Sequence, residues 1–90
     1  RISLIDDLKT EGREGQRRVH LQTPALEGLD IRWFAVAPDG SEREIPELAG
    51  QKDWPTDARS EGRYRAQVTF STPEVRTPTE RFQASRTLSL

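Results

Sequence analysis

Residues 62 to 70, GRYRAQVTF, alternate strictly between apolar and polar side chains. In an extended chain one face carries Tyr64, Ala66, Val68 and Phe70, and the other carries Arg63, Arg65, Gln67 and Thr69. A period of two residues is typical of a strand with one buried and one solvated face. The segment therefore predicts a half-buried antiparallel strand whose apolar face is covered by a second layer.

Other segments predict strands by weaker alternation. Val19, Leu21 and Thr23 share one face of the segment RRVHLQT, and residues 2 to 8 fit an edge strand. Near the end of the chain, one parity is shared by Phe82, Ala84, Leu88 and Leu90, and Arg86 interrupts it. These runs are short and separated by turn-forming clusters, as in an all-β domain.

A hairpin is predicted for residues 31 to 45, IRWFAVAPDGSEREI. Pro38 presets the first turn position, Asp39 suits the next, and Gly40 tolerates the positive φ that closes a short loop. No segment sustains the 3.6-residue period of a helix over three turns. The order of short strands and turns predicts an all-β fold, a two-sheet antiparallel sandwich of about seven strands.

The chain has room for one domain with one core. Its 90 residues form a single predicted domain, residues 1–90. Apolar and charged residues each make up 32% of the sequence, and the mean hydropathy is −0.83, so the two layers must be thin. The first residues, RISLIDDLK, resemble neither a signal peptide nor an initiating methionine. We therefore expect a module of a larger polypeptide.

Charge and cysteine content exclude several functional classes. The formal net charge is −1, and no block of like charge occurs, so we expect no nucleic-acid partner. No apolar run approaches the roughly 18 residues of a membrane helix, so we expect no direct membrane insertion. Because the sequence contains no cysteine, it has no disulfide, thiol nucleophile or cysteine metal site.

Three features of the sequence resemble the immunoglobulin fold in its cysteine-free form. Glu14-Gly15 precedes the strand-like RRVHLQT as an acidic-glycine turn does in many such domains, and Trp33 points inward from the next predicted strand. Residues 61 to 66, EGRYRA, look like the corner and strand that carry the family's buried tyrosine. The resemblance spans nearly the whole chain. Similar cysteine-poor domains occur in bacterial surface adhesins, in phage tail and capsid proteins, and in intracellular muscle proteins.

The resemblance implies roles for individual residues. Tyr64 would fold its hydroxyl back onto the backbone as a tyrosine corner, and Gly62 would permit a tight approach there. Val19 or Leu21, together with Ala66, would stand where the family has its paired cysteines. Packing would then replace a crosslink worth about 2 to 4 kcal/mol.

The same resemblance outlines a core and a strand count. The core would centre on Trp33, Tyr64, Val68 and Phe70. A short strand around residues 51 to 54 would complete seven strands. The alternative is six strong strands plus a degenerate edge.

Catalysis and metal binding find little support in the sequence. His20 is the single histidine, alternation turns it away from the core, and no nucleophile motif accompanies it. The candidate oxygen donors for calcium form no EF-hand loop; they are Asp6, Asp7, Asp53, Asp57 and Glu61. The glycines of residues 11 to 15 precede no lysine at the spacing of a phosphate-binding loop. We predict no enzyme, no metal site and no cofactor.

Two apolar residues on the predicted hairpin are expected to face outward. If Trp33 points into the core, strand parity turns Phe34 and Val36 to the opposite face. Exposed apolar side chains on a charged sheet mark partner surfaces. The predicted protein-contact face consists of Arg32, Phe34, Val36, Arg63 and Arg65. The alternative is that the hairpin or an adjoining domain covers these side chains.

Trp54, which precedes Pro55, has two interpretations. An exposed tryptophan stacks on a sugar face in a carbohydrate-binding module, whereas in a small sandwich it more often caps the open end of the core. We favour the core and keep a glycan contact at Trp54 as the alternative.

Together these patterns predict a non-catalytic structural or adhesive module. It would contact neighbouring domains of the same polypeptide or a protein ligand, within a surface, virion or filament-associated protein. The alternative function is a carbohydrate-binding module that uses Trp54. An extracellular surface or a virion is the expected location, with a cytoplasmic filament as the alternative.

Overall fold

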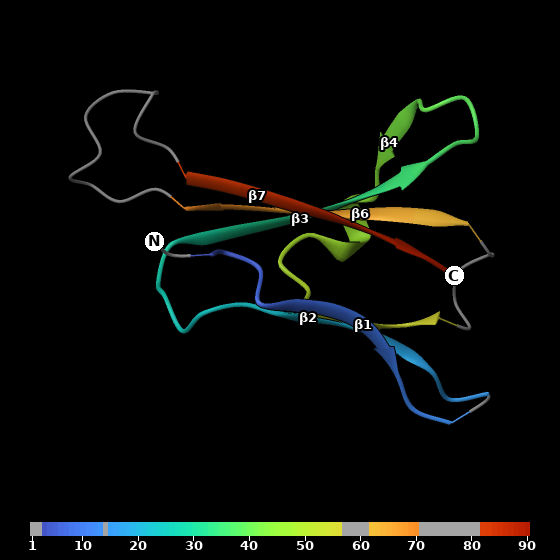
Figure 1. Ribbon diagram of the computed structural model, residues 1–90, viewed down its shortest axis with the longest axis horizontal. Helices are drawn as coiled ribbons and strands as arrows, with labels where there is room; N and C mark the ends of the chain where they lie inside the picture. Colours follow the sequence, from blue (N-terminus) through green and yellow to red (C-terminus); the bar gives the residue numbers. More distant parts are fainter. Residues whose placement is uncertain (1–2, 14, 57–61, 71–81) are drawn as a thin grey trace.

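The computed structural model of the chain describes residues 3–13, 15–56, 62–70 and 82–90. The strands in these residues are β1 (Asp7–Glu11), β2 (Arg18–Gln22), β3 (Leu29–Val36), β4 (Glu42–Glu44), β5 (Asp53–Pro55), β6 (Arg63–Phe70) and β7 (Phe82–Ser89), with a short 3-10 turn, η1 (Pro46–Leu48), after β4. They form two antiparallel sheets, ordered β1-β2-β5 and β4-β3-β6-β7, which lie one above the other (Figure 1). The predicted all-β, two-sheet fold is confirmed.

The strand predicted most clearly and the predicted hairpin both form. β6 pairs with β3 and with β7 along its whole length, and its buried side chains alternate as its sequence does. β3 turns into β4 through the loop around Pro38, where the N–H of Ala37 donates to the carbonyl of Ser41 at 2.8 Å. The carboxylate of Asp39 accepts hydrogen bonds from the N–H and the hydroxyl of Ser41, at 2.9 and 2.7 Å.

The N-terminal strand begins later than the sequence predicts. The sequence predicts an edge strand over residues 2 to 8, but β1 covers Asp7–Glu11. Leu4 and Ile5 are both buried, although successive side chains of a strand point to opposite faces. The segment before β1 is therefore irregular, and it inserts two adjacent side chains into the core.

Three aromatic rings join the two sheets. Trp33 on β3 and Trp54 on β5 meet edge to face, with ring centroids 5.4 Å apart, and Trp54 meets Tyr64 on β6 at 5.3 Å. Trp33 also donates from Nε1 to the carbonyl of Gln51 at 2.8 Å. Trp54 is buried as well, but its Nε1 has no hydrogen-bond partner among the described residues. Because Trp54 lies in one sheet and the other two rings in the second, this cluster holds the layers together.

The residues that the resemblance assigns to the positions of paired cysteines are packed in the core. Val19, Leu21 and Ala66 are fully buried, as is Val68. Phe70, at the end of β6, is only partly buried against the same core. Ordinary apolar packing therefore occupies the positions that the resemblance assigns to paired cysteines.

The corner before β6 depends on a glycine for a different reason than the resemblance implies. Gly62 has a φ of 153°, which side-chain-bearing residues rarely adopt. A Cβ there would meet no described atom within 4 Å, so the glycine is needed for its backbone angle and not for a tight approach. Tyr64 is buried at the start of β6. The remaining predicted corner residue, Glu61, lies outside the described residues.

The two tryptophans allow a matched test of the core. Trp33→Phe removes a hydrogen bond as well as ring volume, whereas Trp54→Phe removes ring volume and a buried N–H without a partner. We expect Trp33→Phe to lower the free energy of unfolding by about 1 kcal/mol more than Trp54→Phe does, the typical net value of a hydrogen bond. Urea unfolding of the two variants checks this, and equal losses would contradict the role given to the Trp33 hydrogen bond.

Candidate functional site

The five residues of the predicted contact face do come together on one side of a sheet. In the register of β3 and β6, Phe34 lies opposite Arg65, Val36 lies opposite Arg63, and Arg32 lies opposite Gln67. Side chains of directly paired residues share a face, and this is the face opposite Trp33 and Tyr64. Strand parity alone therefore grouped these residues correctly.

Arg65 covers much of this face. Its Nε and Nη2 donate to the two carboxylate oxygens of Glu42 at 2.8 and 2.9 Å, and its Nη1 donates to Gln67 at 3.0 Å. Its guanidinium carbon lies 4.4 Å from the ring centroid of Phe34, a cation–π distance. Phe34 points outward but is half-buried beneath this guanidinium. The face presents an ordered arginine–carboxylate pair in place of the bare aromatic ring that the sequence predicts.

The rest of the face is also linked by charge. Arg32 pairs with Asp30 at 2.9 Å and with Glu44 at 3.5 Å. The hydrogen bond from Arg65 is the main cause that lowers the pKa of the Glu42 carboxyl below its ordinary value. Val36 is half-buried and Arg63 is exposed. Ion pairs between exposed side chains contribute little, with a median of about 0 to 1 kcal/mol, so we expect charged contacts on this face to add little to the affinity for a partner.

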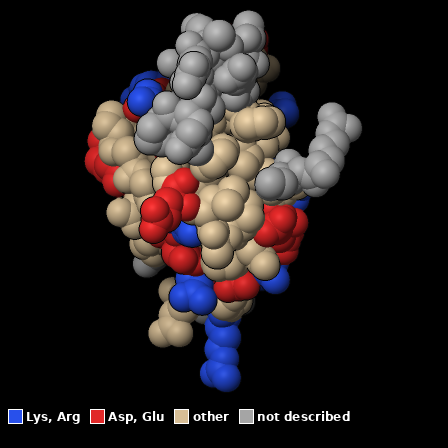
Figure 2. All heavy atoms as spheres, turned by 90° about the vertical axis from the view of Figure 1, so that its left-hand side faces the viewer, with Lys and Arg blue, Asp and Glu red and all other residues tan. Residues whose placement is uncertain are grey.

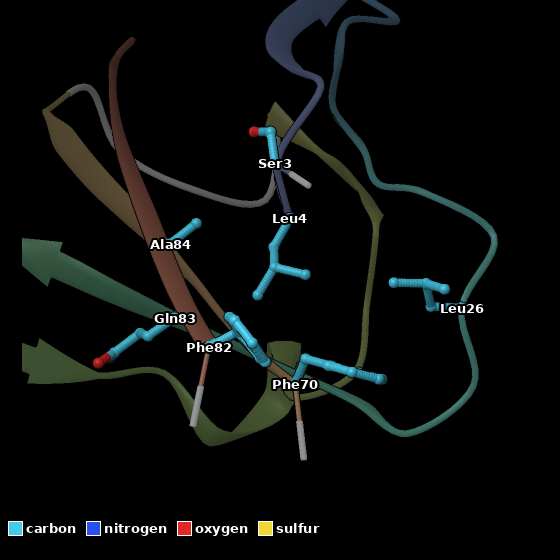
Figure 3. Close-up of a pocket in the computed structure, with 7 residues that line it drawn as sticks. All are labelled: Ser3, Leu4, Leu26, Phe70, Phe82, Gln83 and Ala84. Carbon is cyan, nitrogen blue, oxygen red and sulfur yellow. The ribbon is translucent and has the colours of Figure 1, made fainter. Parts of the chain in front are cut away.

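The largest exposed apolar side chains lie elsewhere. Among the described residues, these are Phe82, which is 59% exposed, and Leu26, which is 37% exposed. Both line a hollow of about 850 Å³, together with Ser3, Leu4, Phe70, Gln83 and Ala84. Figure 3 shows Leu4 and Leu26 directed into the space beside the rings of Phe70 and Phe82. We call this set of residues the end hollow.

The end hollow arises because the two sheets differ in length. Phe70 ends β6 and Phe82 begins β7, and the two residues are paired, with ring centroids 6.3 Å apart. Figure 1 shows β6 and β7 reaching beyond the adjacent end of β1 and β2. Irregular segments that carry Leu4 and Leu26 face this overhang. In Figure 2, which views this end, uncharged residues occupy the middle, and both acidic and basic residues lie around them.

The sequence signal for the end hollow was misleading. Phe82 shares its parity with Ala84 and Leu88, so alternation assigns it to the core. Parity fixes which face a side chain takes, but not whether the opposite sheet extends far enough to cover it. Leu26 lies in a turn cluster without alternation, and no local pattern marks it.

Trp54 is not placed to stack on a sugar. It is 3% exposed, and it packs against Trp33 and Tyr64. Sugar stacking requires an open ring face. The glycan alternative therefore loses the residue on which it depends.

The candidate catalytic residue, His20, lies in a solvated polar network with one of the candidate oxygen donors, Asp53. His20 on β2 is paired in register with Asp53 on β5, and Nδ1 lies 2.6 Å from the carboxylate. Arg18 lies between Asp53 and Glu11. No cluster of three or more metal-ligating side chains occurs in the described part of the chain. Of the predicted oxygen donors, Asp57 and Glu61 lie outside that part.

Asp6 and Asp7 do not converge on a site with Asp53. Asp7 accepts a hydrogen bond from the N–H of Leu8 and approaches Lys9 at 3.8 Å.

No helix in the described residues is long and apolar enough to cross a membrane.

Comparison with known proteins identifies no relative. No family model matches the sequence. Neither the curated proteins nor the solved structures include a significant match. The function of this chain is therefore inferred from its own geometry.

The pairing of Glu42 with Arg65 predicts a pH effect on stability. Because the folded state lowers the pKa of Glu42, the ionised pair stabilises the fold fully above the ordinary value of 4.5 and loses this effect as the pH falls through the folded pKa. We expect the difference in the free energy of unfolding between the native protein and Glu42→Gln to shrink as the pH falls from 6 to 3. The change should follow the uptake of a single proton by Glu42. Urea unfolding across this range measures it.

An NMR titration supplies the control. In Arg65→Met, the pKa of Glu42 should return towards 4.5, because the donor that lowers it is gone. A pKa that does not move in this variant would contradict the assigned cause.

Proposed function

We propose that this domain is a non-catalytic, immunoglobulin-like contact module that binds protein through its end hollow. The observation that carries the proposal is the largely exposed ring of Phe82 beside an open apolar space. Large exposed apolar side chains gathered around a concave site mark interaction surfaces more often than chance exposure does. The outer face around Arg65 is the second surface for contacts, with a smaller contribution.

The strand order supports the immunoglobulin-like part of the proposal. If β1, β2, β3, β5, β6 and β7 correspond to strands A, B, C, E, F and G, then A, B and E share one sheet while C, F and G share the other, as in the family. β4 adds a strand beside β3 in the second sheet. Trp33 on the C equivalent and Tyr64 near the start of the F equivalent are both buried.

A module of this kind acts by rigid presentation. The sandwich holds the rings of Phe70 and Phe82 on paired strands, so a ligand meets a preformed surface and little ordering is required on binding. Complete burial of a phenylalanine or leucine side chain contributes about 1.5 to 3 kcal/mol. The partner is a neighbouring domain of the same polypeptide or a separate protein, in a surface, virion or filament-associated assembly.

A random peptide library displayed on phage tests this function without a known ligand. We expect selected peptides to carry an apolar residue and to bind Phe82→Ser about tenfold more weakly than the native domain, which corresponds to about 1.4 kcal/mol of lost burial. Phe34→Ser is the matched variant on the outer face and should weaken binding much less than Phe82→Ser does. Circular dichroism and urea unfolding verify that both variants are folded.

Two outcomes would contradict the assignment. Failure to select any specific peptide would argue against a contact function. Selected peptides that lose affinity in Phe34→Ser but not in Phe82→Ser would move the contact site from the end hollow to the outer face.

A further inference from the structure

The four edge strands of the two sheets differ in how well they are protected. Exposed edges pair with other chains unless they are short, charged, bulged or interrupted by proline. β4 has three residues, all of them charged, and β5 has three residues and ends in Pro55. β1 carries Asp7, Lys9 and Glu11, which are linked by ion pairs. Three edges therefore carry recognised safeguards.

β7 is the exception. Its eight residues pair with β6 in an uninterrupted register, and Arg86 is the single charged residue among them. No described strand pairs with its other side. The strand is therefore long, regular and nearly uncharged, which are the properties of an edge that accepts a further strand.

The backbone groups on the free side of β7 can be assigned. The N–H of Leu90 donates to the carbonyl of Gly62 at 2.7 Å, so Leu90 directs its backbone groups towards β6. Backbone direction alternates along an antiparallel strand. The N–H and C=O groups that point away from β6 therefore belong to Gln83, Ser85, Thr87 and Ser89. All four of these residues are exposed.

We propose that the free edge of β7 binds an extended segment of a partner protein by strand addition. This inference rests on the proposed contact function and names the class of partner. An added strand would hydrogen-bond to the outward groups of β7 and continue the sheet β4-β3-β6-β7. Its side chains would alternate between the outer face and the inner face that borders the end hollow.

Arg86 determines which strands fit. It lies opposite Ala66 on the inner face of β7, it is exposed, and none of the ion pairs in the described part of the chain includes it. A second copy of this chain that overlaps residues 83 to 89 symmetrically brings Arg86 directly opposite its counterpart, and like charges at that position are destabilising. A partner strand with a carboxylate opposite Arg86 gains an ion pair.

The end hollow sets a second requirement. Phe82 and Ala84 lie on the same face as Arg86 and line the end hollow (Figure 3). A partner residue two or four positions from the acid lies beside Ala84 or Phe82, because same-face residues recur every second position. An apolar side chain at these positions can enter the end hollow. The partner is therefore an extended segment in which an acidic residue and an apolar residue alternate with uncharged residues.

Labelled synthetic peptides test the proposal. The probe is the peptide Thr-Glu-Thr-Val-Thr-Leu-Thr, made also in the reverse order to allow both strand directions. The control replaces its glutamate with lysine. We expect fluorescence anisotropy to show about threefold to tenfold tighter binding of the glutamate peptide in one direction, the range expected when one favourable cross-strand charge pair replaces an unfavourable one. Arg86→Glu should reverse the preference between the two peptides.

A backbone variant tests strand pairing itself. Ser85→Pro removes an N–H that faces away from β6, a position at which an edge strand accommodates proline. The substitution should weaken peptide binding at least tenfold. Ser85→Val keeps the N–H and should bind like the native domain. If Ser85→Pro fails to fold, the charge reversal at Arg86 still decides the question.

Several results would overturn strand addition. One is that neither glutamate peptide binds, and another is that binding is unchanged in both Ser85→Pro and Arg86→Glu. A third is a dimer in sedimentation that dissociates in Ser85→Pro, which would show that a second copy of the chain occupies the edge. Phage-selected peptides that require Phe82 but bind Ser85→Pro normally would leave the contact function intact and reject strand addition alone.

Discussion

The edge-to-face contacts of Trp54 with Trp33 and Tyr64 are the interactions on which the rest of this fold depends. They connect a strand of the smaller sheet to two strands of the larger one. Each such contact is worth about 0.5 to 1.5 kcal/mol beyond the area it buries. Two of them approach the lower range of a disulfide, about 2 to 4 kcal/mol, and burial of the rings adds more. A chain without cysteine therefore keeps its layers together through aromatic packing.

The position of this cluster also explains where the surfaces form. The rings lie between β3, β5 and β6, away from the end of the sandwich at Phe70 and Phe82. At that end no large aromatic side chain from the smaller sheet covers the overhanging strands; Leu4 and Leu26 approach from irregular segments instead. The result is a hollow and not a closed core. On the outer face of the same sheet, Arg65 and Glu42 supply the cover that a second layer would otherwise provide.

The sequence pattern within single segments predicted those parts of the fold that depend on strand parity and on the backbone preferences of individual residues. The alternation in β6, the turn at Gly40 and the inward direction of Trp33 follow from strand parity and backbone preference, and each is observed. The pattern was wrong at Leu4 and Ile5, because it assumed a strand where an irregular segment buries both. It did not reveal that Arg65 stacks on Phe34 or that Phe82 lacks cover. Those features depend on cross-strand register and on the relative lengths of two sheets, which no single segment encodes.

The effect of Arg86 depends on its position at the edge of the larger sheet. In the sequence it is only an interruption of an apolar face, and burial of an unpaired guanidinium there would be strongly unfavourable. At the border of the sheet the inner face opens to solvent, so the charge is retained at little cost. The same charge then bears on any strand that approaches β7, because a direct cross-strand pair is favourable with a carboxylate and unfavourable with another arginine. Such a pair contributes less than about 1 kcal/mol in either direction, yet the difference between the two cases is enough to favour a foreign acidic strand over a second copy of the same chain.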